Sequence, residues 1–308
     1  MDAMKILIAY DGTANSDAAV ASLRRAGLPE KAEAIVLTMS DRRLSQELDE
    51  QEELEAGVAV AESRATSGLR SARTASAAAA ERIAGWFPGW SVGAEVSDDA
   101  PAAGILQKIT AWSPNLVVVG THGRSLVGRV LLGSVSQRVL AEARCSVRIG
   151  RRTRNEEGPI RLIVGIDGSR DALAAVTEIA RRAWPSETEA HLVSAYAPLD
   201  LHYAPVVAAL EAGHVDEEDW EFRFVREQVE VAAVTLSAAG LKVVPSVRVG
   251  IPVPVLLDEA ETWSADAIVL GARGHSVIER LLLGSVSSSI AARANCPVDV
   301  IRPWALDA

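Results

Sequence analysis

A glycine-rich segment that occurs twice is the feature that most restricts how this chain can fold. The first copy runs from Gly120 to Ser134 and the second from Gly271 to Ser285, and each has glycine at its first, fourth and fourteenth positions. The copies are offset by a constant 151 residues, which indicates an internal duplication. The chain of 308 residues is therefore expected to form two domains, each large enough to bury its own core.

Each glycine segment lies between a short apolar run and a segment with a helical pattern. Leu116–Val119 and Ala267–Leu270 are predicted as strands buried on both faces of a parallel sheet. Ser134 and Ser285 are expected to begin the helices that follow, with their hydroxyls in the capping position. Glycine allows close approach of the main chain, and free N–H groups at a helix start attract an anion. The pattern predicts a phosphate-binding loop in each copy.

Segments typical of strands and of helices alternate along both halves of the chain. In the first half, strands are predicted at 5–9, 34–39, 91–96, 116–120 and 146–149, with helices at 16–26, within 44–84, at 101–112 and at 135–143. In the second half, strands are predicted at 160–166, 189–195, 241–249, 267–271 and 297–301, with helices ending at 183, at 215–239, after 252 and at 286–294. Alternation of this kind predicts an α/β fold of two tandem doubly wound parallel sheets.

The boundary between the halves is expected where the apolar periodicity is lost. Residues 150–159 carry charge, glycine and proline without a periodic apolar pattern, as an interdomain linker does. We predict one domain at residues 1–150, a linker at 151–159 and a second domain at 160–308. Because the last strand of each domain would otherwise be an exposed edge, we expect an internal pseudo-dimer of the two repeats. Formation of a homodimer by two chains is left open.

Charge and cysteine content restrict the partners and the compartment. A net charge of -10 argues against a nucleic-acid partner, and no segment is long enough to span a bilayer. The apolar run near the N-terminus is too short for a signal peptide. Cys145 and Cys296 occupy matched positions and are expected to be buried packing residues in a reducing compartment, rather than a disulfide or a metal pair. We therefore predict a cytoplasmic protein with no membrane partner.

An Asp-Gly-Thr or Asp-Gly-Ser turn follows the first predicted strand of each half, with its aspartate at Asp11 or Asp167. If the first and fourth strands are neighbours, each aspartate faces the glycine loop of its own half. Both would then lie at the carboxyl ends of the strands, where open parallel sheets bind ligands. A simple turn or helix-capping role is the alternative for each aspartate.

Together these features resemble the universal stress protein family, in its tandem, ATP-binding form. The family motif is glycine, two residues, glycine, nine residues, glycine and a small polar residue, and both copies satisfy it without a gap. The aspartate turns and Cys296-Pro297-Val298 also match family signatures, whereas Ser146 stands where the family usually has proline. The resemblance covers nearly the whole chain and implies a Rossmann-like fold of the adenine nucleotide alpha hydrolase-like kind.

The resemblance implies an ATP site in each half, with or without Mg²⁺ and with no dedicated metal ligands. It implies main-chain contacts from Met39 and Ala195 to adenine, and positions for Asp11 and Asp167 near the ribose and any metal ion. The glycine loops would enclose the ribose and phosphates. In the first site these residues are Gly120, His122, Gly123, Gly133, Ser134, Val135 and Ser136, and in the second Gly271, Arg273, Gly274, Gly284, Ser285, Val286 and Ser287.

The two loops differ in charge, because Arg273 stands in the second loop where His122 stands in the first. A guanidinium stays charged, whereas a histidine near neutral pH is mostly neutral. We therefore expect both sites to bind ATP, with unequal affinity.

The sequence contains no P-loop, no Gly-x-Ser-x-Gly elbow and no clear nucleophile with an attendant base. The loops are suited to holding ATP rather than cleaving it, so we expect a regulatory nucleotide-binding protein of the stress response and not an enzyme. One alternative is a slow Mg-dependent ATPase or a related nucleotide-cleaving enzyme, which would use Arg124, Arg273, Asp11 or Asp167. Another is a scaffold that uses the fold without ATP.

Overall fold

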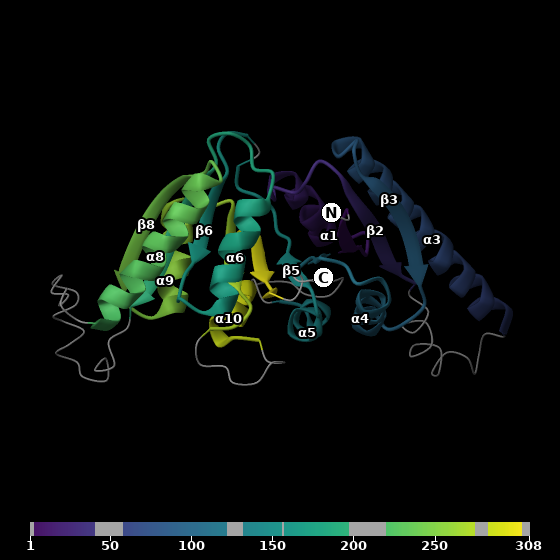
Figure 1. The fold of residues 1–308 in the computed structure, drawn as a ribbon. Helices are drawn as coiled ribbons and strands as arrows, with labels where there is room; N and C mark the ends of the chain where they lie inside the picture. The colour runs from purple at the N-terminus through teal and green to yellow at the C-terminus, as the bar shows by residue number, and fades with distance from the viewer. Residues whose placement is uncertain are drawn as a thin grey trace. The chain divides into compact units, whose positions relative to one another are not determined.

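The computed structural model describes residues 3–40, 58–121, 132–155, 157–196, 220–274 and 283–303. The chain divides into two compact units. Unit 1 comprises Met1–Arg24 and Pro29–Arg152, and unit 2 comprises Arg25–Leu28 and Thr153–Ala308. Each unit has a parallel β-sheet with helices packed on it (Figure 1).

The sheet of unit 1 has the strand order β3-β2-β1-β4-β5, with every neighbouring pair parallel. Its strands are β1 (Met4–Ala9), β2 (Ala32–Met39), β3 (Ser91–Ser97), β4 (Leu116–Val119) and β5 (Ser146–Ile149). The helical elements are α1 (Ala14–Ala21), the 3-10 helix η1 (Ser22–Arg25), whose last residue belongs to unit 2, α3 (Val58–Trp86), α4 (Pro101–Trp112) and α5 (Ser134–Glu142). Helix α3 packs on β2 and β3, and α4 packs on α5.

The sheet of unit 2 has the corresponding strand order, β10-β9-β6-β7-β8, and is also parallel. Its strands are β6 (Arg161–Gly165), β7 (Glu189–Tyr196), β8 (Lys242–Val249), β9 (Ala267–Gly271) and β10 (Val298–Ile301). Its helices are α6 (Arg170–Arg181), α8 (Trp220–Ala238), α9 (Pro252–Thr262) and α10 (Ser285–Arg293). Helix α6 contacts α8, and α9 contacts α10. Every residue of β9 and β10 is buried, as both faces of a doubly wound sheet must be.

The predicted α/β fold with tandem parallel sheets is confirmed, and most expected elements are present with shifted ends. The helix expected at 16–26 ends at Ala21, and a 3-10 turn follows it. Of the segment 44–84, residues 41–57 lie outside the described residues, and Val58–Trp86 is a single helix rich in alanine, the strongest helix former. The predicted pairing of the two repeats stays a prediction.

Both cysteines are buried, as the sequence predicted. A search of the described ranges finds no helix with the length and apolar character needed to cross a membrane.

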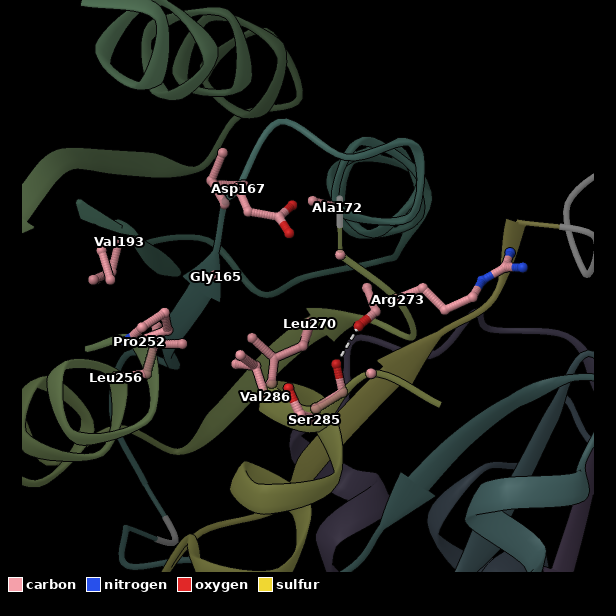
Figure 2. A pocket seen from close by; sticks show the side chains of 16 residues that line it. Gly165, Asp167, Ala172, Val193, Pro252, Leu256, Leu270, Arg273, Ser285 and Val286 are labelled. Carbon is pink, nitrogen blue, oxygen red and sulfur yellow. Dashed lines mark hydrogen bonds between the residues drawn. The ribbon is translucent and has the colours of Figure 1, made fainter. Parts of the chain in front are cut away.

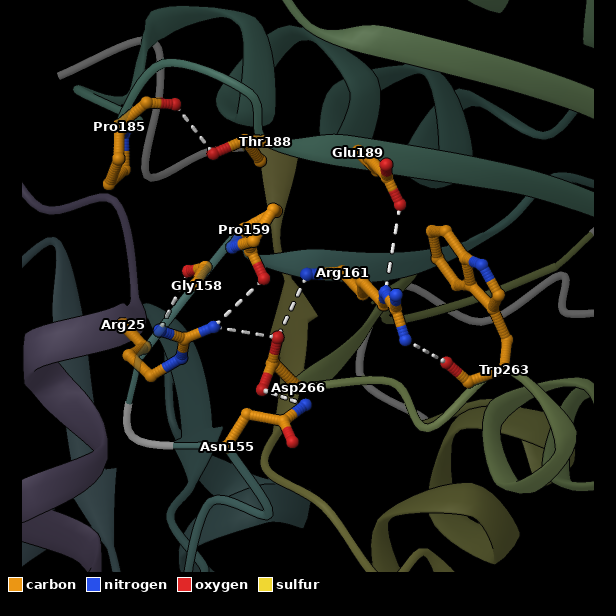
Figure 3. A network of polar contacts seen from close by, with 10 residues as sticks. All are labelled: Arg25, Asn155, Gly158, Pro159, Arg161, Pro185, Thr188, Glu189, Trp263 and Asp266. Carbon is orange, nitrogen blue, oxygen red and sulfur yellow. Dashed lines mark hydrogen bonds and ion pairs between the residues drawn. The ribbon is translucent and has the colours of Figure 1, made fainter.

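A buried carboxylate joins several main-chain segments of unit 2 (Figure 3). The side chain of Asp266 has no exposed surface, and its Oδ2 accepts hydrogen bonds from Nη2 of Arg25 and from the main-chain N–H of Arg161, both at 2.9 Å. The Arg25 guanidinium also donates to the carbonyl oxygens of Gly158 and Pro159, at 3.3 and 3.0 Å. Because both charges are removed from water, each depends on the other for compensation.

His191 on β7 is expected to make the stability of unit 2 depend on pH. Its Nδ1 lies 3.8 Å from Oε2 of Glu259 on α9, and its ring meets Trp263 edge to face. Partial burial lowers the pKa of His191 below its ordinary value; Glu259 acts in the opposite direction and Arg248 in the same direction. The unfolded chain therefore takes up a proton at a higher pH than the folded chain does.

We expect the free energy of unfolding to decrease as the pH falls below about 6.5, the ordinary pKa of histidine, and to decrease less in His191→Gln. Urea denaturation of both proteins between pH 5 and 7.5 measures this difference. Parallel curves for the two proteins would show that His191 contributes nothing to the pH dependence.

Candidate functional site

The strand order brings the aspartate turn and the glycine segment of each unit to the same edge of the sheet. In unit 1, β1 lies between β2 and β4, and in unit 2, β6 lies between β7 and β9. Asp11 follows β1 and Gly120 follows β4, while Asp167 follows β6 and Gly271 ends β9. All four residues thus lie at carboxyl ends of neighbouring parallel strands, where open α/β sheets bind ligands.

Each aspartate closes a tight turn with one of its carboxylate oxygens. Oδ1 of Asp11 accepts from the N–H of Thr13 at 3.0 Å, and Oδ1 of Asp167 accepts from the N–H of Ser169 at 2.9 Å. The glycine within the turn has a left-handed φ of 76° in unit 1 and 78° in unit 2. In unit 2 the other oxygen, Oδ2, is so close to Gly274 that a Cβ there would lie 2.6 Å away. Asp167 therefore both closes the turn and lies beside the glycine loop.

Hydrogen bonds within the glycine segment hold it against its strand. In unit 2 the N–H of Gly284 donates to the carbonyl of Ala272 at 2.8 Å, and Oγ of Ser287 donates to the carbonyl of Gly271 at 2.6 Å. Both hydrogen bonds recur in unit 1, from Gly133 N to Thr121 O at 2.5 Å and from Ser136 Oγ to Gly120 O at 2.6 Å. The two serine hydroxyls therefore fix the loop rather than project toward a ligand.

The helix that follows each loop begins without a side-chain cap. Gly284 is the N-cap of α10 and Gly133 the N-cap of α5, and neither helix has a side-chain capping hydrogen bond. The prediction that Ser134 and Ser285 occupy the capping position is therefore wrong by one residue. In both helices the first-turn N–H groups have no intrahelical acceptor and carry the positive end of the helix dipole. These groups are suited to an anion.

A cavity of about 280 Å³ lies at this edge of unit 2 (Figure 2). All the residues that the sequence assigned to the second site line it: Asp167, Ala195, Gly271, Arg273, Gly274, Gly284, Ser285, Val286 and Ser287. Seven lining residues were not predicted: Gly165, Ile166, Ala172, Val193, Pro252, Leu256 and Leu270. Most of the seven are apolar, so the cavity joins an apolar wall to an uncapped helix start. Residue alternation on β7 could have indicated Val193, two positions before Ala195.

Arg273 lines the cavity, but its guanidinium is bonded to Asp171 of α6. Nε lies 2.9 Å from Oδ2 and Nη2 lies 3.1 Å from Oδ1, while the main-chain N–H donates to Oδ2 at 3.1 Å. Oγ of Ser169 donates to the carbonyl of Arg273 at 3.1 Å. Figure 2 shows the guanidinium extending away from Asp167 and Leu256. In this placement the side chain clamps the loop to the start of α6.

The two copies of the repeat contain a signal for this ion pair. The copies align with an offset of 156 residues at the aspartate turn, which matches Asn15 to Asp171. The half with Arg273 at the third loop position thus has an acid on the facing helix, and the half with His122 at that position has an amide.

Comparison with known proteins identifies the chain's relatives. A profile of the universal stress protein family matches residues 3–151 and again residues 160–302. The chain belongs to the universal stress protein family. A universal stress protein of Mycolicibacterium smegmatis is 30% identical over 217 residues, which are 70% of either chain. One from Mycobacterium tuberculosis is 29% identical over 197 residues, 61% of this chain and 61% of the length of that relative.

Solved structures of universal stress proteins share the fold. A universal stress protein from Archaeoglobus fulgidus has a TM-score of 0.62 and 21% identity, with 98% of this chain and 100% of that chain covered. A putative universal stress protein from Pseudomonas aeruginosa has a TM-score of 0.55 and 14% identity, with 99% of this chain and 95% of that chain covered. At these identities the likeness concerns the fold alone.

The first predicted site of this universal stress protein is described in part. His122 and Gly123, together with Arg124, lie outside the described residues. The other predicted residues lie at the ends of elements of unit 1. Asp11 follows β1, Met39 ends β2 and Gly120 follows β4, while Gly133 precedes α5 and Ser134, Val135 and Ser136 begin it. Within the described part of the chain, no group of three or more histidine, cysteine, aspartate or glutamate side chains could hold a metal ion.

Proposed function

We propose that this universal stress protein binds ATP in the cavity of unit 2 and acts as a regulatory protein of the stress response. One observation carries the proposal: a single cavity combines an apolar wall, the aspartate Asp167 and the uncapped start of α10. A nucleotide needs all three in one place. The cavity volume of about 280 Å³ is slightly below the roughly 300–1,000 Å³ typical of small-molecule sites.

The apolar wall and the start of α10 suggest where each part of the nucleotide would bind. The base would lie between the end of β7, at Val193 and Ala195, and the apolar side chains of Pro252 and Leu256 on α9. The triphosphate would lie at the first turn of α10, where unpaired N–H groups and the helix dipole favour negative charge. Mg²⁺ would be bound mainly by the phosphates and water, as this ion commonly is in nucleotide sites.

We propose that ATP is held and not cleaved. Cleavage requires a cation on the γ-phosphate and a group that orients the attacking water. Arg273 is the cation in the described part of the loop, and its guanidinium is bonded to Asp171. The slow ATPase is the competing function, and turnover of Mg-ATP that Asp167→Ala abolishes would support it.

Mass spectrometry of small molecules released from the purified protein, together with isothermal titration with ATP, tests the proposal. We expect ATP among the released molecules and saturable binding on titration. Absence of both would contradict the proposal and would favour a scaffold that uses the fold without nucleotide.

The clamp between Arg273 and Asp171 leads to a prediction. If it positions the loop, Arg273→Ala and Asp171→Ala should each weaken ATP binding about tenfold, or about 1.4 kcal/mol. The double variant should be no weaker than either single variant, because both changes remove the same interaction. Titration of the three proteins measures this. If Arg273 contacted phosphate directly, Asp171→Ala would release the arginine and would not weaken binding.

A cytoplasmic location and the absence of a nucleic-acid partner belong to the same proposal and rest on the sequence.

A further inference from the structure

The sheet registers define which residues of the two units correspond. Ile6 pairs with Ala34 in unit 1, and Leu162 pairs with Ala190 in unit 2, so β1 and β2 match β6 and β7 with one offset of 156 residues. By this offset Met39 corresponds to Ala195. Helices α4 and α9 both begin at a proline and follow the offset of 151 residues found in the glycine loops.

In unit 2 the end of β7 leaves the space beside α9 open. Ala195 has only a methyl group, and it lines the cavity together with Pro252 and Leu256 of α9. This is the part of the cavity that the proposed function assigns to the base.

In unit 1 the side chain of Met39 crosses the corresponding space from β2 to α4. A Cβ placed on Gly104 of α4 would lie 2.9 Å from Sδ and 3.1 Å from Cε of Met39. Both distances are shorter than ordinary van der Waals contact, so the thioether packs directly on the bare main chain of α4.

Gly104 leaves room for the side chain of Met39 and also for that of Asp99, whose Cβ would lie 3.1 Å from a Cβ at this position. Glycine inside a helix destabilises it by roughly 0.5–1 kcal/mol relative to alanine, so its presence at the fourth position of α4 has a local cost. Alanine at this position would overlap the sulfur atom of Met39. The corresponding position of unit 2 is Val255, which has no methionine facing it from β7.

A second difference adds bulk near the same place in unit 1. Tyr10 corresponds to Ile166, a residue that lines the cavity of unit 2. The Tyr10 hydroxyl donates to Oδ1 of Asp17 at 2.8 Å, which holds the ring beside α1. A third difference leaves the total side-chain volume of unit 1 nearly unchanged. Ala9 stands where unit 2 has the smaller Gly165, and Val119 stands where unit 2 has the larger Leu270.

We infer that Met39 closes the base-binding part of unit 1, so that the chain binds one ATP, in unit 2. This inference rests on the proposed function, because it compares unit 1 with the cavity to which ATP is assigned. By this inference, one side chain decides whether a unit binds the base: the methionine or the alanine at the end of its second strand.

Counting ATP sites by titration tests the inference. The unaltered protein is expected to bind one ATP per chain, and Met39→Ala is expected to bind two. Met4→Ala is the matched control, because it truncates a methionine at the opposite end of the neighbouring strand β1, and it should bind one. The reciprocal change, Ala195→Met, should weaken binding at least about tenfold by filling the cavity of unit 2.

The outcomes separate this inference from the proposed function. No binding by the unaltered protein would refute the proposed function itself. Two equal sites in the unaltered protein would overturn the inference and leave the proposed function intact, and a count of one in folded Met39→Ala would overturn the role of Met39. If Met39→Ala does not fold, photolabelling of the unaltered protein with 8-azido-ATP decides: label confined to unit 2 supports the inference, and label in both units overturns it.

Discussion

Replacing Gly284 with glutamate is expected to reduce ATP binding by at least about 100-fold, or roughly 2.7 kcal/mol. Gly284 is the N-cap of α10, and a Cβ there would lie 3.1 Å from the carbonyl oxygen of Ala272 and 3.4 Å from Cα of Arg273. The new side chain must therefore displace the loop. Its carboxylate would also occupy the anion-attracting end of the helix and repel the triphosphate. Isothermal titration with ATP measures the loss.

Gly133→Glu provides the matched control, because Gly133 is the N-cap of α5 in the corresponding loop of unit 1. If unit 2 holds the ATP, this variant should retain the affinity of the unaltered protein. Thermal denaturation of both variants shows whether each remains folded. Full ATP retention in folded Gly284→Glu would contradict the assignment of the cavity.

Replacing Asp266 with alanine is expected to destabilise unit 2 by about 3–5 kcal/mol. The carboxylate has no exposed surface, and the side chain of Arg25 is 10% exposed, so removal of the acid leaves a buried guanidinium uncompensated. The N–H of Arg161 loses its acceptor at the same time. The free energy of unfolding from urea denaturation measures the effect.

An exposed ion pair on α8 serves as the control for this prediction. Glu230 lies one helical turn from Arg226, with both side chains more than half exposed. Because solvent-exposed pairs of this kind contribute only about 0.3–0.5 kcal/mol, Glu230→Ala should change the stability little. A loss below about 1 kcal/mol in Asp266→Ala would show that water or another group compensates Arg25.

The residues proposed for the second site could be found from the sequence because their function depends on local properties. A glycine at Gly271 or Gly284 is recognisable by spacing alone, and a helix start is recognisable by the change from apolar run to helical pattern. The aspartate turn is equally local, since Asp167 bonds to a residue two positions away. All of these residues line one cavity.

The partners of long side chains could not be found in this way. The resemblance placed Arg273 among the residues that would enclose the ribose and phosphates, but not beside Asp171, to which it bonds and which is 102 residues away in sequence. The apolar wall formed by Val193 and Leu256 likewise depends on how β7 and α9 pack. Pattern analysis identifies which elements form but not which side chains meet between them.

The sequence by itself determined the duplication, the α/β class, the family and the two glycine loops, because each can be recognised from residue spacing and periodicity along the chain. The tertiary structure alone decided that glycine caps α5 and α10, that Arg273 clamps its loop, and that Met39 packs on Gly104 where unit 2 has a cavity. The physical reason is that side-chain volume and charge act on whatever lies within a few ångströms, and packing rather than sequence order selects those neighbours.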